Sequence, residues 1–168
     1  MKPKIYVLVG CIASGKGTYC KQAAKHGKII LNDDSIVNML HGDDYTLYDK
    51  GLKLLYKSIE NSIISLGLCA GRTIIVDRGL NVSKQGRKRW LALAKSFDVE
   101  CHAIVLPKDT PEIHAERRFK SDSRGYSYDY WLRVATHHDS IYSEPTIEEG
   151  FDEIHSTNFI KLTQGEMI

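Results

Sequence analysis

Residues 10–18 read GCIASGKGT, a glycine-rich segment whose spacing could bind phosphate. It follows the apolar run 5–9 directly and precedes a helix-compatible stretch. Backbone N–H groups can curl around a phosphate only where side chains leave room, which favours glycine in such a loop. Lys16 can then reach the β- and γ-phosphates, and the positive N-terminus of the following helix points at them. This P-loop predicts a nucleoside triphosphate site with the contacts Gly10, Ala13, Ser14, Gly15, Lys16, Gly17 and Thr18.

Magnesium is the metal expected with such a nucleotide, and its protein ligands are left open by the sequence. The residue after Lys16 is Gly17, where P-loops commonly have a Ser or Thr hydroxyl that binds magnesium. That hydroxyl is displaced here to Thr18. Mg²⁺ prefers oxygen ligands and keeps several waters. Thr18 and the acidic side chain of Asp77 are the candidate ligands. The alternative is that Thr18 contacts the α-phosphate while phosphates, water and an acidic side chain hold the metal.

Two acidic segments each follow a predicted strand. Asn32-Asp33-Asp34-Ser35 comes directly after the strand expected over 28–31 and would set a carboxylate opposite the γ-phosphate, where a general base is needed. The alternative is that an Asp or Ser there caps the next helix. Asp77 ends the β-branched run 73–76 and could bind magnesium or substrate, or could form a turn.

Basic residues gather in two places. One group lies on and just beyond a predicted helix, before a polar glycine-containing loop: Arg117, Arg118, Lys120 and Arg124. Such a group is typical of a mobile lid, here over about 117–128, whose arginines close over the nucleotide, and solvated helix charge is the alternative. The other group begins the helix after Asp77, where the helix dipole disfavours cations: Lys84, Arg87, Lys88 and Arg89. It indicates either a polyanionic substrate or a solvated basic face.

Short buried strands alternate with helices along the chain, which predicts an α/β fold with a parallel sheet of about five strands and helices on both faces. Strands are expected over 5–9, 28–31, 73–76 and 101–106, with terminal strand pieces at 152–155 and 159–162. Helices are expected after the P-loop and over 35–40, 47–66, 83–97, 111–120 and 129–142. The aromatic group at 126–131 is expected to pack under the lid, and stacking of bases is the alternative. We expect a single domain over 1–168.

Composition sets broader limits. The chain has 168 residues, 42% of them hydrophobic, and a net charge of +2, which by itself does not demand a nucleic-acid partner. We expect no membrane span or signal peptide and a cytoplasmic location. The four cysteines are widely separated, which predicts free thiols in a reducing compartment, and neither they nor the histidines show zinc-ligand spacing. His137 and His138 are expected to be surface or packing residues.

These motifs together resemble the polynucleotide 5′-hydroxyl kinases of nucleic-acid end repair, within the wider P-loop kinases. Residues 31–35 are similar to that family's hydrophobic-Asn-x-Asp motif, and the resemblance selects Asp34 as the residue that activates the attacking hydroxyl. Val76-Asp77 with 79–81 is similar to the second substrate-side motif, and Arg124 matches a lid arginine. Residues 142–146 and 149–151 are similar to the C-terminal signature.

The resemblance implies a P-loop kinase fold with an arginine-bearing lid and transfer of the γ-phosphate of ATP, or another triphosphate, to a 5′-hydroxyl of DNA or RNA with Mg²⁺. It implies the catalytic residues Lys16, Asp34 and Arg124. The basic and acidic clusters themselves further predict the nucleotide contacts Arg118 and Arg124 and the substrate contacts Asp34, Asp77, Arg78 and Arg87.

The sequence departs from that family at two positions and in one domain. Val37 replaces an arginine that contacts substrate phosphate in phage-type members, Arg78 replaces a small polar residue, and no phosphatase domain accompanies the kinase. A kinase for a nucleotide, a small metabolite or a hydroxymethylated DNA base is therefore the second hypothesis. A nucleotide-hydrolysing switch is the third, and the lid arginines and the absence of an NKxD motif stand against it.

Overall fold

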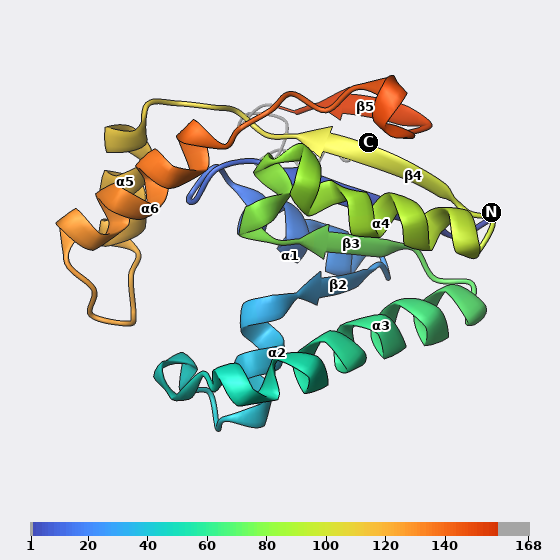
Figure 1. Ribbon diagram of the computed structural model, residues 1–168, viewed down its shortest axis with the longest axis horizontal. Helices are drawn as coiled ribbons and strands as arrows, with labels where there is room; N and C mark the ends of the chain where they lie inside the picture. Colours follow the sequence, from blue (N-terminus) through green and yellow to red (C-terminus); the bar gives the residue numbers. More distant parts are fainter. Residues whose placement is uncertain (1, 158–168) are drawn as a thin grey trace.

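A five-stranded parallel sheet forms the centre of the computed structural model, which describes residues 2–157 (Figure 1). The strands are β1 (Lys4–Val9), β2 (Ile29–Asn32), β3 (Ile74–Asp77), β4 (Glu100–Val105) and β5 (Glu153–Ser156). Their order in the sheet is β2-β3-β1-β4-β5, and every neighbouring pair is parallel. The predicted α/β fold with about five parallel strands is confirmed.

Helices cover both faces of the sheet because its strands are apolar on both sides. In β1, Ile5, Val7 and Val9 face one core cluster, whereas Tyr6 and Leu8 face the other. The first cluster is covered by α3 (Lys53–Cys69) and α4 (Lys84–Ser96), and the second by α1 (Lys16–Lys25). Burial on both faces is what favours a continuous β-branched run over an alternating one.

The remaining helices lie beside the carboxyl ends of the strands (Figure 1). They are α2 (Asp33–Leu40), α5 (Pro111–Lys120) and α6 (Tyr128–Ser140). Helices α5 and α6 pack on each other through Ala115, Trp131 and Ala135, with Tyr126 and Tyr130 against them, so the predicted aromatic packing is confirmed. Within the described residues, every helix is too short or too polar to cross a lipid bilayer.

The starts of two helices, α2 and α3, differ from the prediction by more than one residue. Helix α2 begins at Asp33 and not at Ser35, because the Asn32 side chain accepts a hydrogen bond from the Ser35 N–H at 2.9 Å and caps the helix. The helix expected over 47–66 is replaced at its start by two 3₁₀ turns, Tyr45–Leu47 and Lys50–Leu52, and continues to Cys69. The strand expected at 159–162 lies outside the described residues.

Candidate active site

A cavity of about 880 Å³ opens at the carboxyl ends of the strands. Such a position is where open parallel sheets bind ligands. The P-loop, the start of α2, the end of β3 and the helices α5 and α6 all contribute to its wall. Most predicted nucleotide and substrate residues line it: Ala13, Gly15, Lys16, Gly17, Thr18, Asp34, Asp77, Arg118 and Arg124.

The P-loop has the backbone that its glycines predict. Gly15 has a φ of +102° and caps α1 at its N-terminus, a conformation that L side chains rarely adopt. A Cβ on Gly10 would lie 2.4 Å from the Ser14 Oγ. Gly10 and Ser14 are not among the residues that line the cavity, and Ser14 is fully buried with its hydroxyl beside Gly10. The nucleotide contacts predicted for these two residues stay a prediction.

Lys16 places its ammonium group inside the P-loop. Its Nζ donates hydrogen bonds to the carbonyl oxygens of Gly10, at 2.8 Å, and Cys11, at 2.6 Å. Burial lowers the pKa of Lys16, and the nearby Asp77 carboxylate opposes that shift. The loop therefore holds its cation in place beside a carboxylate of the cavity.

Asp77 is fixed at the end of β3 by its neighbour in β2. Asn32 and Asp77 are paired in the register of the two strands, and the Asn32 Nδ2 donates to the Asp77 Oδ2 at 3.1 Å. Asp77 is 9% exposed, and Thr18 lies exposed in the first turn of α1. A carboxylate and a hydroxyl in one cavity are hard oxygen donors, which fit Mg²⁺.

The two adjacent aspartates at the start of α2 each pair with a different arginine. Asp33 accepts from the Arg78 Nε at 2.9 Å, and Asp34 accepts from the Arg124 Nη2 at 2.6 Å. Burial raises the pKa of Asp33, and the Arg78 guanidinium opposes the rise. Because Asn32 is the helix cap, neither aspartate has the capping role that the sequence left open.

The arginines of the predicted lid reach the cavity from α5 and the following loop. The Arg124 guanidinium lies 3.9 Å from the centre of the Tyr45 ring, and Arg118 lies 4.6 Å from the Trp131 ring. Asp122 orders the loop, since its carboxylate accepts the backbone N–H groups of Arg124 and Tyr126. Arg124 thus connects the lid with the start of α2.

A second cavity of about 300 Å³ lies next to Asp33 and Asp34, and the sequence analysis did not predict it. Its aromatic wall is built from tyrosines that stack in sequence, Tyr45 on Tyr48 and Tyr48 on Tyr56. Its basic side chains are Lys53, Lys57, Arg78 and Arg89, and its acidic side chains are Asp33, Asp34 and Glu60. Arg78 pairs with Asp33 and Arg89 with Glu60, so the two lysines are the cations left for a ligand. The three tyrosines and three lysines within residues 45–57 were the available signal, but residues 47–66 were interpreted only as a helix.

His138 is a further residue whose place at the site was missed. It lies on α6, lines the larger cavity and is 7% exposed. Burial lowers its pKa to about 4, with Lys16 as a second cause, so its imidazole is neutral at pH 7. The prediction of a packing residue fits its burial, but not its place in the cavity wall.

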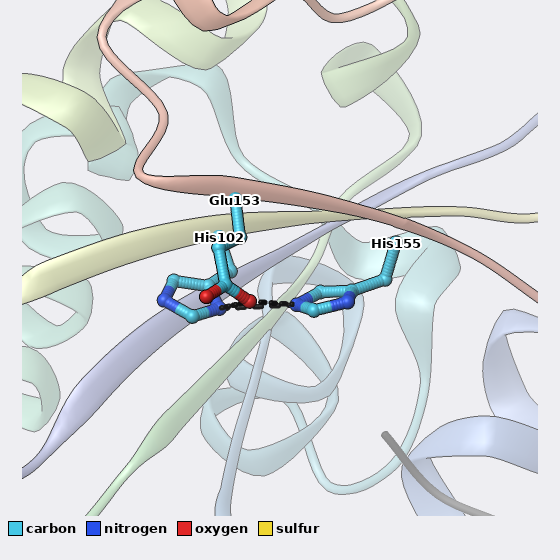
Figure 2. Close-up of side chains that lie close together, drawn as sticks. All are labelled: His102, Glu153 and His155. Carbon is cyan, nitrogen blue, oxygen red and sulfur yellow. Dashed lines mark hydrogen bonds and ion pairs between the residues drawn. The ribbon is translucent and has the colours of Figure 1, made fainter.

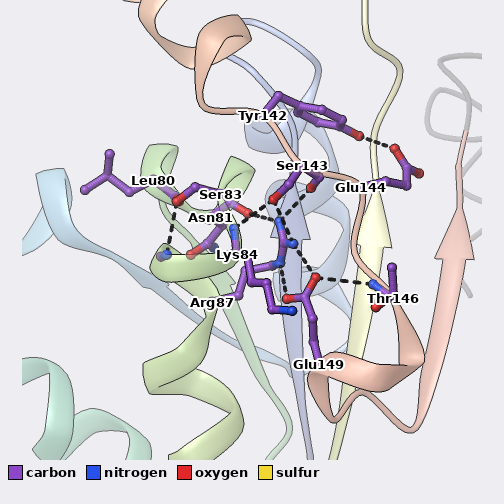
Figure 3. Close-up of polar contacts among 11 residues, drawn as sticks. Leu80, Asn81, Ser83, Lys84, Arg87, Tyr142, Ser143, Glu144, Thr146 and Glu149 are labelled. Carbon is purple, nitrogen blue, oxygen red and sulfur yellow. Dashed lines mark hydrogen bonds and ion pairs between the residues drawn. The ribbon is translucent and has the colours of Figure 1, made fainter.

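Arg87 was predicted to contact substrate, but it does not line either cavity of the candidate site. Its guanidinium is fully buried and forms an ion pair with Glu149 at 2.6 Å. All five of its N–H groups have acceptors, shared among Glu149, Asn81 and Ser143 (Figure 3). A guanidinium with no free donor cannot bind a phosphate. The C-terminal signature containing Glu149 therefore has a structural partner in α4.

Comparison with solved structures shows the same fold in several kinases. A fungal RNA kinase aligns with a TM-score of 0.64 and 15% identity over 93% of this chain, which spans only 38% of that kinase. A gluconokinase from Sinorhizobium meliloti aligns with a TM-score of 0.54 and 14% identity, over 98% of this chain and 88% of that one. Kti12 from Chaetomium thermophilum, in complex with ADP-AlF3, aligns with a TM-score of 0.58 and 14% identity, over 96% of this chain and 95% of that one.

Comparison by sequence assigns the family. No match to a curated protein was found. The family described as AAA domain (AAA_33) matches residues 5–129, which run from β1 through the P-loop and the acidic segments into the start of α6. With its P-loop, its five-stranded parallel sheet and this match over most of its length, the chain belongs to the AAA_33 family and has the P-loop kinase fold.

Proposed function

We propose that this protein is a kinase that transfers the γ-phosphate of ATP to a 5′-hydroxyl end of DNA or RNA, with Mg²⁺. The observation that carries the proposal is the smaller cavity beside Asp34, which combines stacked tyrosines with basic side chains. Single-stranded nucleic acids are held by base stacking on aromatic rings and by cations along the backbone. That cavity therefore suits the end of a polynucleotide.

In the proposed reaction, the hydroxyl oxygen of the acceptor attacks the γ-phosphorus and the bond to the β-phosphate oxygen breaks. Asp34 accepts the hydroxyl proton, and Lys16 stabilises the γ-phosphate. Arg124 and Arg118 neutralise charge that develops on the transferred group. The Thr18 hydroxyl and the Asp77 carboxylate would hold Mg²⁺, which supplies further neutralisation of the phosphate oxygens.

The direct test is a labelled transfer assay with matched acceptors. Label from γ-labelled ATP is followed onto 5′-hydroxyl DNA and RNA oligonucleotides, nucleoside monophosphates, gluconate and DNA with hydroxymethylated bases. Label on the oligonucleotide 5′ end is the expected result, and a 5′-phosphorylated oligonucleotide is the matched control. Transfer to a monomer alone would contradict the proposed acceptor.

Lys16→Ala is expected to lower kcat by about 10²- to 10³-fold, because a cation aimed at the γ-phosphate is lost. Steady-state phosphate transfer measures the effect. Lys25→Ala is the matched control, since Lys25 is exposed in the last turn of the same helix α1 and should keep full activity. A Lys16→Ala protein with normal turnover would rule out the proposed phosphate contact.

Lys57→Gln is expected to weaken oligonucleotide binding and to make it less sensitive to salt. A cation that contacts a single-strand phosphate contributes about 0.7 to the slope of log K against log salt. Lys57 is exposed and lines the smaller cavity, whereas the control Lys50 is exposed in a 3₁₀ turn outside that lining. Fluorescence anisotropy at several salt concentrations measures both slopes. Equal slopes for the Lys57→Gln and Lys50→Gln proteins would contradict a polynucleotide in this cavity.

A small-molecule acceptor is the second candidate, and Val37 favours it. Val37 is 4% exposed, packs in the core and forms part of the wall of the smaller cavity, so this position offers no charge to a substrate phosphate. The gluconokinase described above has the same fold as this chain. A small acceptor predicts a weak salt dependence of substrate binding, which the anisotropy and transfer assays distinguish from the first candidate.

A further inference from the structure

The two strands at one edge of the sheet carry the same short pattern, a glutamate and a histidine separated by one residue. In β4 it is Glu100-Cys101-His102, and in β5 it is Glu153-Ile154-His155. Residues two apart in a strand share a face, and His102 is paired in register with Glu153. The parallel pairing therefore gathers both patterns on one face, and Figure 2 shows the side chains of His102, Glu153 and His155 converging.

The three converging atoms are separated as metal ligands are. The His102 Nδ1 lies 3.1 Å from the His155 Nε2, and the Glu153 Oε2 lies 3.2 Å from the His155 Nε2 and 3.7 Å from the His102 Nδ1. Zinc binds nitrogen and oxygen at about 2.0–2.2 Å in a tetrahedron, which places its ligands roughly 3.3–3.5 Å apart. One ion can therefore be bound by all three atoms with small side-chain adjustments.

A further carboxylate sets the direction of the His102 ring. The Glu100 Oε2 lies 2.9 Å from the His102 Nε2, and the Lys4 ammonium pairs with Glu100 at 2.5 Å. Since the Glu100 carboxylate accepts a hydrogen bond from the Nε2–H, the Nδ1 has a lone pair, which points toward Glu153 and His155. A carboxylate behind a histidine is the usual outer partner of a metal-bound imidazole.

Three potential ligand atoms face one another in this cluster: the His102 Nδ1, the His155 Nε2 and the Glu153 Oε2, all within 4.8 Å of one another. Each of these atoms can present a lone pair to a cation. One cation placed among them would be bound by all three lone pairs at once.

The surroundings leave room for the ion to enter from one side. The His102 side chain is 2% exposed and lies against the Tyr6 ring, at 5.1 Å between ring centres, whereas the Glu153 side chain is 61% exposed. The cluster shares no residue with either cavity of the candidate active site. It is thus separate from the proposed magnesium ligands.

We propose that His102, Glu153 and His155 form a binding site for a divalent transition-metal ion, with Zn²⁺ as the ion whose preferences the site fits, and that the ion fixes the edge strand β5 to β4. Two imidazoles and one carboxylate suit Zn²⁺ better than Mg²⁺ or Ca²⁺, which prefer oxygen ligands. The three side chains leave a coordination position for water. No histidine spacing in the sequence suits zinc, because the ligands come from two strands that only the fold brings together, with His102 and His155 lying 53 residues apart along the chain.

The test is a Zn²⁺ titration of the full chain by calorimetry, after treatment with a chelator. One Zn²⁺ per chain is expected for the wild type and for the control His26→Asn, since His26 is exposed at the end of α1. Loss of an outer partner costs about 10–100-fold in affinity, so Glu100→Gln should fall in that range and His155→Asn should lose about 100-fold or more. Equal affinity in the wild type and the His155→Asn protein would overturn the proposal.

A second variant and two further measurements test the proposal if the His155→Asn protein does not fold or if the ion binds at cysteine. If His155→Asn does not fold, the exposed Glu153→Gln replaces it and should also weaken Zn²⁺ binding. Co²⁺ in place of Zn²⁺ should give visible absorption bands without a thiolate charge-transfer band, whereas a thiolate band would assign the ion to cysteine and contradict the site. Zn²⁺ should raise the Tm of the wild type but not of the variant, because only the folded wild type binds the ion.

Discussion

Asp34→Asn is expected to lower kcat by about 10²- to 10⁴-fold while nucleotide affinity stays unchanged, because general-base catalysis contributes that much and acts only in the transition state. The Asn side chain has nearly the same shape and can still accept the hydrogen bond that Arg124 donates to Asp34. What it loses is the ability to take the hydroxyl proton. Steady-state transfer to the acceptor, together with equilibrium nucleotide binding, separates the two effects.

Asp33→Asn is the matched control for that prediction. Asp33 lies one residue away, lines the same two cavities and also pairs with an arginine, Arg78. Its ion pair is partly exposed, and such pairs contribute about 1 kcal/mol or less, so the expected change in rate is within about fivefold. A larger loss of kcat in Asp33→Asn than in Asp34→Asn would reverse the assignment of the base.

The fold was predictable because its signals are local. The continuous β-branched run at 73–76 and the glycine spacing of the P-loop each determine an element without reference to distant residues. The residues at which helices begin were less predictable, because a side chain can accept a hydrogen bond from the backbone N–H groups there. Asn32, for example, starts α2 earlier than expected because its amide oxygen accepts the Ser35 N–H.

The residues of the candidate site also fall into two groups: those that could be placed from the sequence and those that depend on contacts between distant segments. Residues of the P-loop and the strand ends could be placed from the chain order alone, because parallel strands bring their carboxyl ends together. The tyrosine-lined cavity, the histidine–glutamate cluster and the partners of Arg87 depend on contacts between distant segments. Arg87 was wrongly assigned to substrate because a sequence does not show that Glu149, 62 residues away, neutralises its charge.

Glu149→Gln is expected to destabilise the protein by about 3–5 kcal/mol, because it leaves the buried Arg87 charge without a counter-ion. The two side chains are 0% and 3% exposed, so water cannot replace the lost carboxylate. Urea unfolding measures the change, and Glu148→Gln is the control, since Glu148 is exposed and should shift stability by no more than about 0.5 kcal/mol.

The double variant Arg87→Met, Glu149→Leu separates the cost of an unpaired charge from the value of the pair itself. Removing both charges also removes the desolvation cost, so this protein should be markedly more stable than Glu149→Gln even though hydrogen bonds to Asn81 and Ser143 are lost. If the double variant were instead as unstable as the single one, those hydrogen bonds and not the charge would hold the C-terminal signature against α4.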